Sequence, residues 1–94
     1  MVQIYKRKNY CIYSSHKQSH AYIVHNKNKE FSNGHTHISN YNTAKFIINM
    51  AINKTIPKTK VNDYILLSII RVSEDKEYIK KLEEKRCKTN AQKR

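Results

Sequence analysis

The stretch HTHISNYNTAKFIINMAIN, residues 35–53, contains the change of pattern that decides the fold. Before residue 40 the chain is rich in residue types that favour strands. After it, apolar residues recur at helical spacing and form one stripe: Tyr41, Ala44, Ile47, Ile48, Ala51 and Ile52. Asn40 or Asn42 can cap this helix, because a short side-chain oxygen accepts a hydrogen bond from a free backbone amide. The chain therefore changes from sheet to helix near residue 40.

The N-terminal region, residues 2–39, is rich in Tyr, Ile, Val, Thr, Ser and His, and it contains the one glycine, Gly34. Three segments of this composition are expected to be strands: Ile4–Ser14, Ala21–His25 and about Phe31–Ile38. Their connections are Ser15–His20 and Asn26–Lys29. The first strand can bend near Lys6–Lys8, where apolar residues fall on both faces.

Two further helices are predicted after the first. Pro57 ends the first helix, because proline cannot continue the hydrogen-bond ladder. The second, about Val61–Val72, is apolar nearly all round and must contact its neighbours on several sides. Ser73 is the predicted N-cap of the third helix, which carries Tyr78 and Leu82 on one face.

The predicted fold class is α+β: a small N-terminal antiparallel sheet of two to three strands, followed by three helices. The first two helices, separated by a proline-containing turn, also permit a helix-turn-helix variant. We expect a single domain, residues 1–94, with a basic sheet region (1–39), a helical scaffold (40–87) and a frayed tail (88–94).

The charge of the chain is strongly positive and unevenly distributed. The chain contains nineteen Lys and Arg and seven Asp and Glu, so its net charge is +12. Residues 1–60 hold ten of these cations and a single acid, Glu30. Such a field attracts polyanions and releases counterions from phosphates on binding. Nucleic acid is therefore the favoured partner, although an AT-rich genome would also enrich the chain in Lys, Asn, Ile and Tyr.

The termini and the cysteines indicate a cytoplasmic protein. The start MVQIYKRKNY lacks the apolar core of a signal peptide, and the longest apolar run, Tyr64–Ile70, is too short to span a bilayer. Cys11 and Cys87 lie at opposite ends of the chain and define no disulfide framework. We expect no membrane partner and no cofactor. We also expect a homodimer, because its interface would add apolar burial to so small a chain.

The candidate interface is the basic sheet with its turns, together with lysines of the first helix and of the turn that follows it. A ribbon of strands fits the major groove, with alternate side chains toward bases and turn lysines on phosphates. The predicted contacts are Lys6, Arg7, Lys8, Tyr13, Lys17, Lys27, Asn28, Lys29, Lys45, Lys58 and Lys60. Two alternatives remain open: lysines that only guard sheet edges, and base reading by the helix pair.

Two resemblances point the same way. YIVHNKNKEF (22–31), Gly34 and NTAKFIINMA (42–51) resemble the three-stranded-sheet-plus-helix DNA readers, which include integrase N-terminal domains and AP2-type domains. The whole chain is similar in character to small basic accessory proteins of mobile elements, such as the relaxosome proteins of conjugative plasmids. These resemblances imply sequence-selective binding of double-stranded DNA by an accessory or regulatory factor of a plasmid or phage, with RNA as a further possibility.

The histidines are the remaining candidates for chemistry. His35 and His37 lie on one face of a strand, where a pair of imidazoles can bind zinc or act as acid and base. No third ligand has motif spacing, so we expect no metal site, no catalytic residue and no enzyme. Two alternatives remain: an inhibitor from a phage or plasmid that binds a host protein or nucleoprotein, and a small RNase toxin using His35 and His37.

Overall fold

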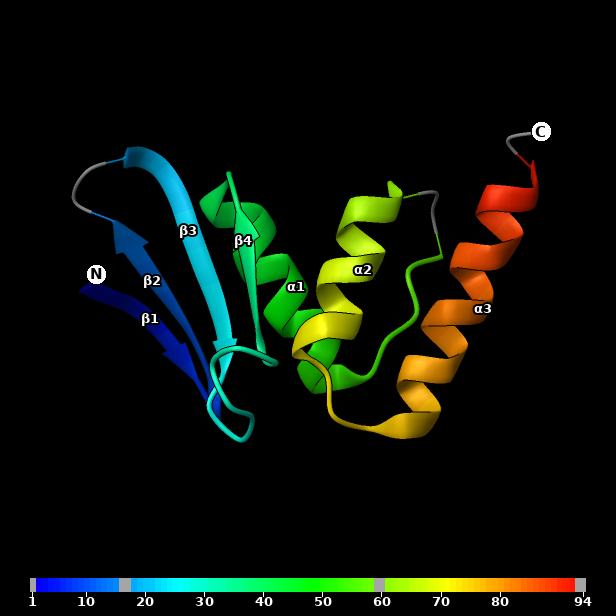
Figure 1. Cartoon of the computed structure of the whole chain (residues 1–94), viewed down its shortest axis with the longest axis horizontal. Helices are drawn as coiled ribbons and strands as arrows, with labels where there is room; N and C mark the ends of the chain where they lie inside the picture. Colours follow the sequence, from blue (N-terminus) through cyan, green and yellow to red (C-terminus); the bar gives the residue numbers. More distant parts are fainter. Residues whose placement is uncertain (1, 16–17, 59–60, 93–94) are drawn as a thin grey trace.

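The chain forms a four-stranded sheet followed by three helices, as the computed structural model shows for residues 2–15, 18–58 and 61–92 (Figure 1). The strands are β1 (Val2–Arg7), β2 (Tyr10–Ser15), β3 (Gln18–Asn26) and β4 (His35–Ile38). The helices are α1 (Tyr41–Asn53), α2 (Asp63–Val72) and α3 (Lys76–Gln92). The α+β class is confirmed, with four strands in place of two to three.

The additional strand comes from a hairpin inside the segment predicted as one strand, Ile4–Ser14. Lys8 takes a left-handed φ of 55°, so the chain reverses at Lys8 and Asn9. Asn and Gly are the usual signals for such backbone, and a lysine at that place gives none. The sheet runs in the order β1-β2-β3-β4 with every neighbouring pair antiparallel.

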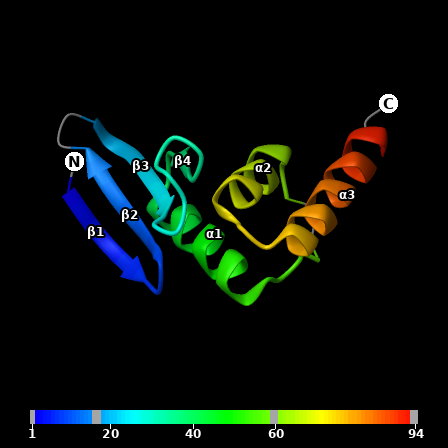
Figure 2. The same ribbon diagram turned by 60° about the horizontal axis from the view of Figure 1, so that its bottom comes forward.

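The core lies between one face of the sheet and the first two helices. Facing residues along this side of the strands include Tyr5, Ile12, Val24 and Thr36, paired in that order across the four strands. The buried hydrophobic residues that meet there are Tyr10, Ile12, Val24, Ile38, Ala44, Ile47, Ile48, Ala51, Leu66, Ile69, Val72, Tyr78 and Leu82. Figure 2 shows α1 and α2 beside the sheet and α3 beyond α2. Among the described residues, no helix covers the other face of the sheet.

The helix ends follow the expected capping chemistry at one position and depart from it at another. Asn40 caps α1, with its side chain accepting a hydrogen bond from the amide of Thr43. Ser73 does not cap α3. Its hydroxyl donates to the carbonyl of Ile69 at the end of α2, and Asp75 caps α3 by accepting from the amides of Glu77 and Tyr78. Ser73 and Asp75 are both good caps by residue type, and the last turn of α2 takes the serine.

Helix α2 is central, as its apolar sequence predicts. It packs against α1, α3, β3 and β4, while Tyr64 and Leu67 remain exposed. α3 is helical to Gln92, within the segment 88–94 for which the sequence predicts fraying. Within the part of the chain that the structure describes, no helix is both long and apolar enough to cross a bilayer.

Candidate nucleic-acid interface

The open face of the sheet consists of two parallel rows of side chains. The strand pairing sets both rows, because residues that face each other across an antiparallel ladder point to the same side. From β1 to β4, the first row is Lys6, Cys11, His25 and His35. The second row is Gln3, Tyr13, Ile23 and His37. A cation therefore stands at the β1 end of the first row and a histidine at the β4 end of each.

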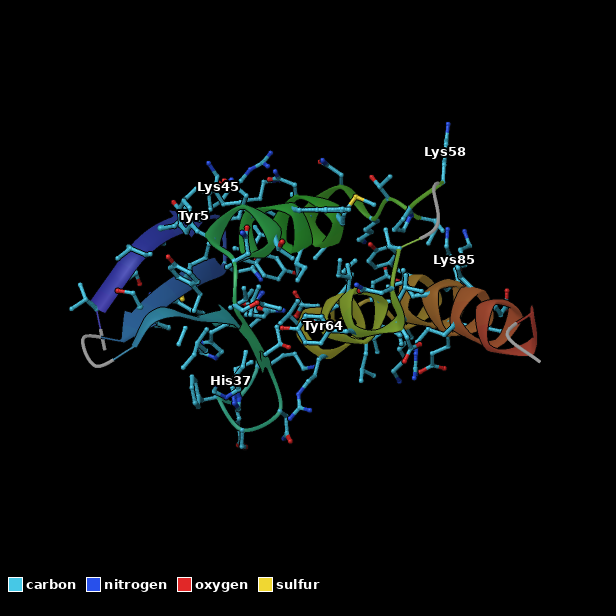
Figure 3. All side chains as sticks on the ribbon, turned by 90° about the horizontal axis from the view of Figure 1, so that it is seen from above. Tyr5, His37, Lys45, Lys58, Tyr64 and Lys85 are labelled. Atoms are coloured by element: carbon cyan, nitrogen blue, oxygen red, sulfur yellow. The ribbon has the colours of Figure 1, made fainter. Side chains whose placement is uncertain are left out.

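Five rings form a continuous aromatic strip on this face: Tyr13, His25, Phe31, His35 and His37. Tyr13 and His25 have ring centroids 6.4 Å apart, and His25 meets Phe31 edge to face at 5.2 Å. Phe31 stacks on His35 at 4.2 Å with 5° between the planes, and His35 meets His37 at 5.1 Å. Figure 3 places His37 on the opposite side of the molecule from Lys45 of α1. The strip thus extends from β2 to the outer edge of β4.

The loop between β3 and β4 holds Phe31 over the sheet. His25 Nε2 donates to the carbonyl of Lys29 at 3.2 Å, and His35 Nδ1 bonds the carbonyl of Phe31. Gly34 is buried in this loop, and a Cβ added there would lie 2.6 Å from the Cβ of Lys29. A larger residue than glycine would therefore displace the loop and the ring that it carries.

The outer edge of β4 is held by α2. Tyr64 donates its hydroxyl to the carbonyl of His37, and Arg71 Nε donates to the carbonyl of His35 at 3.0 Å. These two carbonyls belong to the residues that end the strip. The histidine end of the strip is consequently fixed to the helical scaffold.

Cations gather around β1 and the adjacent turns, and we call this group the cationic edge: Lys6, Arg7, Lys8, Lys27 and Lys45. Arg7 Nη1 donates to Asn49 of α1. Lys45, also on α1, lies with its Nζ 5.3 Å from the ring centroid of Tyr5. Lys8 and Lys27 occupy two turns that are joined by a hydrogen bond from the amide of Lys27 to the carbonyl of Asn9, 2.7 Å long. Lys6 also belongs to the first row of the open face, so the cationic edge borders that face at this residue.

Two predicted contacts have structural partners in the α2–α3 connection. Lys29 Nζ donates to the carbonyls of Arg71 (3.1 Å) and Ser73 (3.2 Å), at the negative end of α2. Asn28 Nδ2 donates to Glu74 Oε1 at 3.1 Å. Both side chains attach the β3–β4 loop to the helices. Because this loop carries Phe31, they help to fix the position of the strip.

The remaining predicted contacts do not join this surface. Lys58 is exposed and lies near Lys85 in Figure 3, at the other end of the molecule from Tyr5 and Lys45. Lys17 and Lys60 fall outside the described residues. α1 ends at Asn53 and α2 begins at Asp63, a longer connection than the three or four residues of a helix-turn-helix. The geometry thus favours the sheet over the helix pair.

A cleft of about 390 Å³ adjoins the cationic edge and contains charges of both signs. Lys8, Lys54, Glu74 and Asp75 are among the residues that line it. Lys54 and Asp75 form an ion pair of 2.7 Å, and the hydrogen bond with Lys54 lowers the pKa of the Asp75 carboxyl. Of the described residues, two lysines and two acids line this cleft, so their charges balance. The cleft therefore adds little to the attraction for an anion.

The sequence predicts Tyr13 as a nucleic-acid contact, but it does not predict the other four rings of the strip. The pattern His-Thr-His places His35 and His37 on one face, but the position of Phe31 depends on the loop contacts above. The described residues contain no group of three His, Cys, Asp or Glu side chains that could hold a metal ion. Each histidine of the strip meets at least one other ring of it.

The chain shows no match to protein-family models, to curated proteins or to solved structures. Its function must accordingly be inferred from the geometry and charge of this surface.

Proposed function

We propose that the protein binds nucleic acid through the open face of the sheet and the cationic edge, and that it does so without catalysing a reaction. The observation that carries the proposal is the juxtaposition of the two surfaces at Lys6. That residue belongs both to the first row of the open face and to the cationic edge. Phosphates can then lie along the edge while bases lie over the sheet.

The distribution of acids supports the same conclusion. Residues 1–60 contain a single acid, Glu30, and five of the ten cations in that segment form the edge. Two other cations of the segment, Lys29 and Lys54, are engaged by α2 carbonyls and by Asp75. Lys8 shares its cleft with Glu74 and Asp75 of the α2–α3 connection, of which Asp75 is paired with Lys54. The charge along β1 remains predominantly positive, which favours phosphate binding and long-range attraction of a polyanion.

Double-stranded DNA, the partner that the sequence favours, makes a specific demand on this face. A sheet in the major groove reads base edges with long side chains that donate and accept hydrogen bonds. In the two rows, Gln3 and Lys6 are the long, flexible side chains of this kind, and both lie on β1, whereas the other hydrogen-bonding nitrogens and oxygens belong to the rings of Tyr13, His25, His35 and His37. A duplex would thus be bound mainly through its phosphates, as an accessory factor of a plasmid or phage can do.

Fluorescence anisotropy with a labelled oligonucleotide at several salt concentrations tests the proposed function. With three to five phosphates neutralised, the plot of log K against log salt should have a slope of about −3 to −4.5 for a duplex, or about −2 to −3.5 for a single strand, between roughly 50 and 200 mM salt. The reason is that each contact releases condensed counterions. A slope near zero, or no measurable binding at about 50 mM salt, would contradict the proposal.

A further inference from the structure

We propose that the aromatic strip stacks unpaired nucleobases, so that the nucleic acid bound is single-stranded. This inference rests on the proposed function and names the class of ligand for the same surface. Planar rings offer a face to any base that is not already stacked within a duplex, and this binding depends little on base identity. Unpaired bases of DNA and of RNA share this chemistry.

Two of the rings in the strip are accessible at the surface. Phe31 is 42% exposed although it contacts His25 and His35, and His37 at the end of the strip is also exposed. An exposed aromatic ring in a loop has no role in the core, which lies on the other face of the sheet. Its uncovered area is available to a base.

The rings at the β4 end of the strip are held in place without a ligand. Phe31 is stacked on His35, whose backbone carbonyl accepts a hydrogen bond from Arg71. The carbonyl of His37 accepts one from Tyr64. A fixed platform loses little side-chain freedom when a base stacks on it, so more of the stacking free energy appears as affinity.

The two rows of the open face also match the layout of a nucleotide chain, with a cation at the β1 end of the first row and a ring at the β4 end of each. The first row leads from Lys6 on β1 to His25 and His35, and the second from Gln3 to Tyr13 and His37. A backbone that follows β1 would therefore direct its bases across the strip. The phenol of Tyr13 is neutral at pH 7, as a tyrosine ordinarily is, and a side-chain hydrogen bond with Cys11 raises its pKa further.

Single strands and duplexes differ in what they can offer to the strip. In a duplex the faces of the bases are stacked on each other, so the rings of the strip would meet only groove edges. In the strip, one ring nitrogen of His25 and one of His35 are already engaged by the carbonyls of Lys29 and Phe31, so few of its donors and acceptors are available to read those edges. Single strands are consequently the better ligand for this face.

The test measures binding of Phe31→Ala to three labelled probes: oligothymidylate and oligouridylate of about twelve nucleotides, and a DNA duplex of similar length. Loss of one stacking ring should weaken binding of the two single strands about ten-fold and change duplex binding less than about two-fold. The control is Leu67→Ala, because Leu67 on α2 is 43% exposed and lies outside the strip. It should change none of the three affinities by more than about two-fold.

His37→Ala is a second variant in which the loop is left intact, and it should also weaken the single strands selectively. Equal losses for duplex and single strands, or no effect of either variant, would overturn the stacking inference. Tighter binding of the duplex than of both single strands would overturn it as well, while the proposed function stands. Failure of the unmodified protein to bind any of the three probes would overturn both. The two single-stranded probes show whether DNA or RNA is preferred.

Discussion

The variant Asn26→Asp is expected to lose about 3 kcal/mol of unfolding free energy or more. Asn26 is fully buried at the end of β3. Its Nδ2 donates to the carbonyl of Val72 at 2.8 Å, and its Oδ1 accepts from Asn9 Nδ2 at 2.6 Å. The amide of Asn28 donates to the same oxygen at 2.9 Å. One side chain thus joins the β1–β2 turn, the β3–β4 loop and the last turn of α2.

An aspartate at this position has no donor for the Val72 carbonyl and would bury a carboxylate beside it. The loss is measured by urea unfolding at pH 7, followed by circular dichroism. The control, Asn33→Asp, makes the same chemical change on an exposed loop residue and should cost less than about 0.5 kcal/mol. If Asn26→Asp cost less than about 1 kcal/mol, the assigned role of this residue would be wrong.

Replacing three lysines of the cationic edge by glutamine should produce the largest functional effect. We expect the triple variant Lys6→Gln, Lys8→Gln and Lys27→Gln to bind single-stranded nucleic acid about 30-fold more weakly at about 50 mM salt. The salt slope should fall in magnitude by about 2 to 3, because each lost phosphate contact removes about one unit. The three side chains are exposed, so the fold should be retained.

The matched control removes the same number of charges from the helical end of the molecule. This control variant carries Lys58→Gln, Lys80→Gln and Lys81→Gln. The three lysines are exposed and lie in or near α3, away from the sheet. This second triple variant should lose less than about three-fold in affinity. Equal losses for the two triple variants would mean that net charge alone, and not the edge, determines binding.

The fold class and the helices are predictable from the sequence because their signals are local. The apolar stripe beginning at Tyr41 and the cap Asn40 define α1 without reference to any distant residue. The β1–β2 hairpin is not predictable in this way, since the left-handed backbone at Lys8 has no residue signature. The start of α3 likewise depended on whether Ser73 or Asp75 would act as the cap.

The candidate site, too, is predictable from the sequence only where its signals are local. The cations of β1 and its turns are evident from composition, and the structure brings Lys6, Arg7 and Lys8 together with Lys27. Asn28 and Lys29 look equivalent to Lys27 in sequence, yet their partners are residues 71–74, more than 40 positions away. Phe31 becomes part of the strip only through the loop that places it against His35. Such contacts are set by tertiary packing and leave no local pattern.

The most direct test of the central claim is a backbone amide chemical-shift titration of the whole chain with oligothymidylate of about twelve nucleotides. If the open face and the cationic edge bind nucleic acid, the largest shifts will be at Lys6, Lys8, His25, Phe31 and His37. Shifts confined to α3 or to the cleft at Lys54, or spread evenly over the surface, would contradict the account.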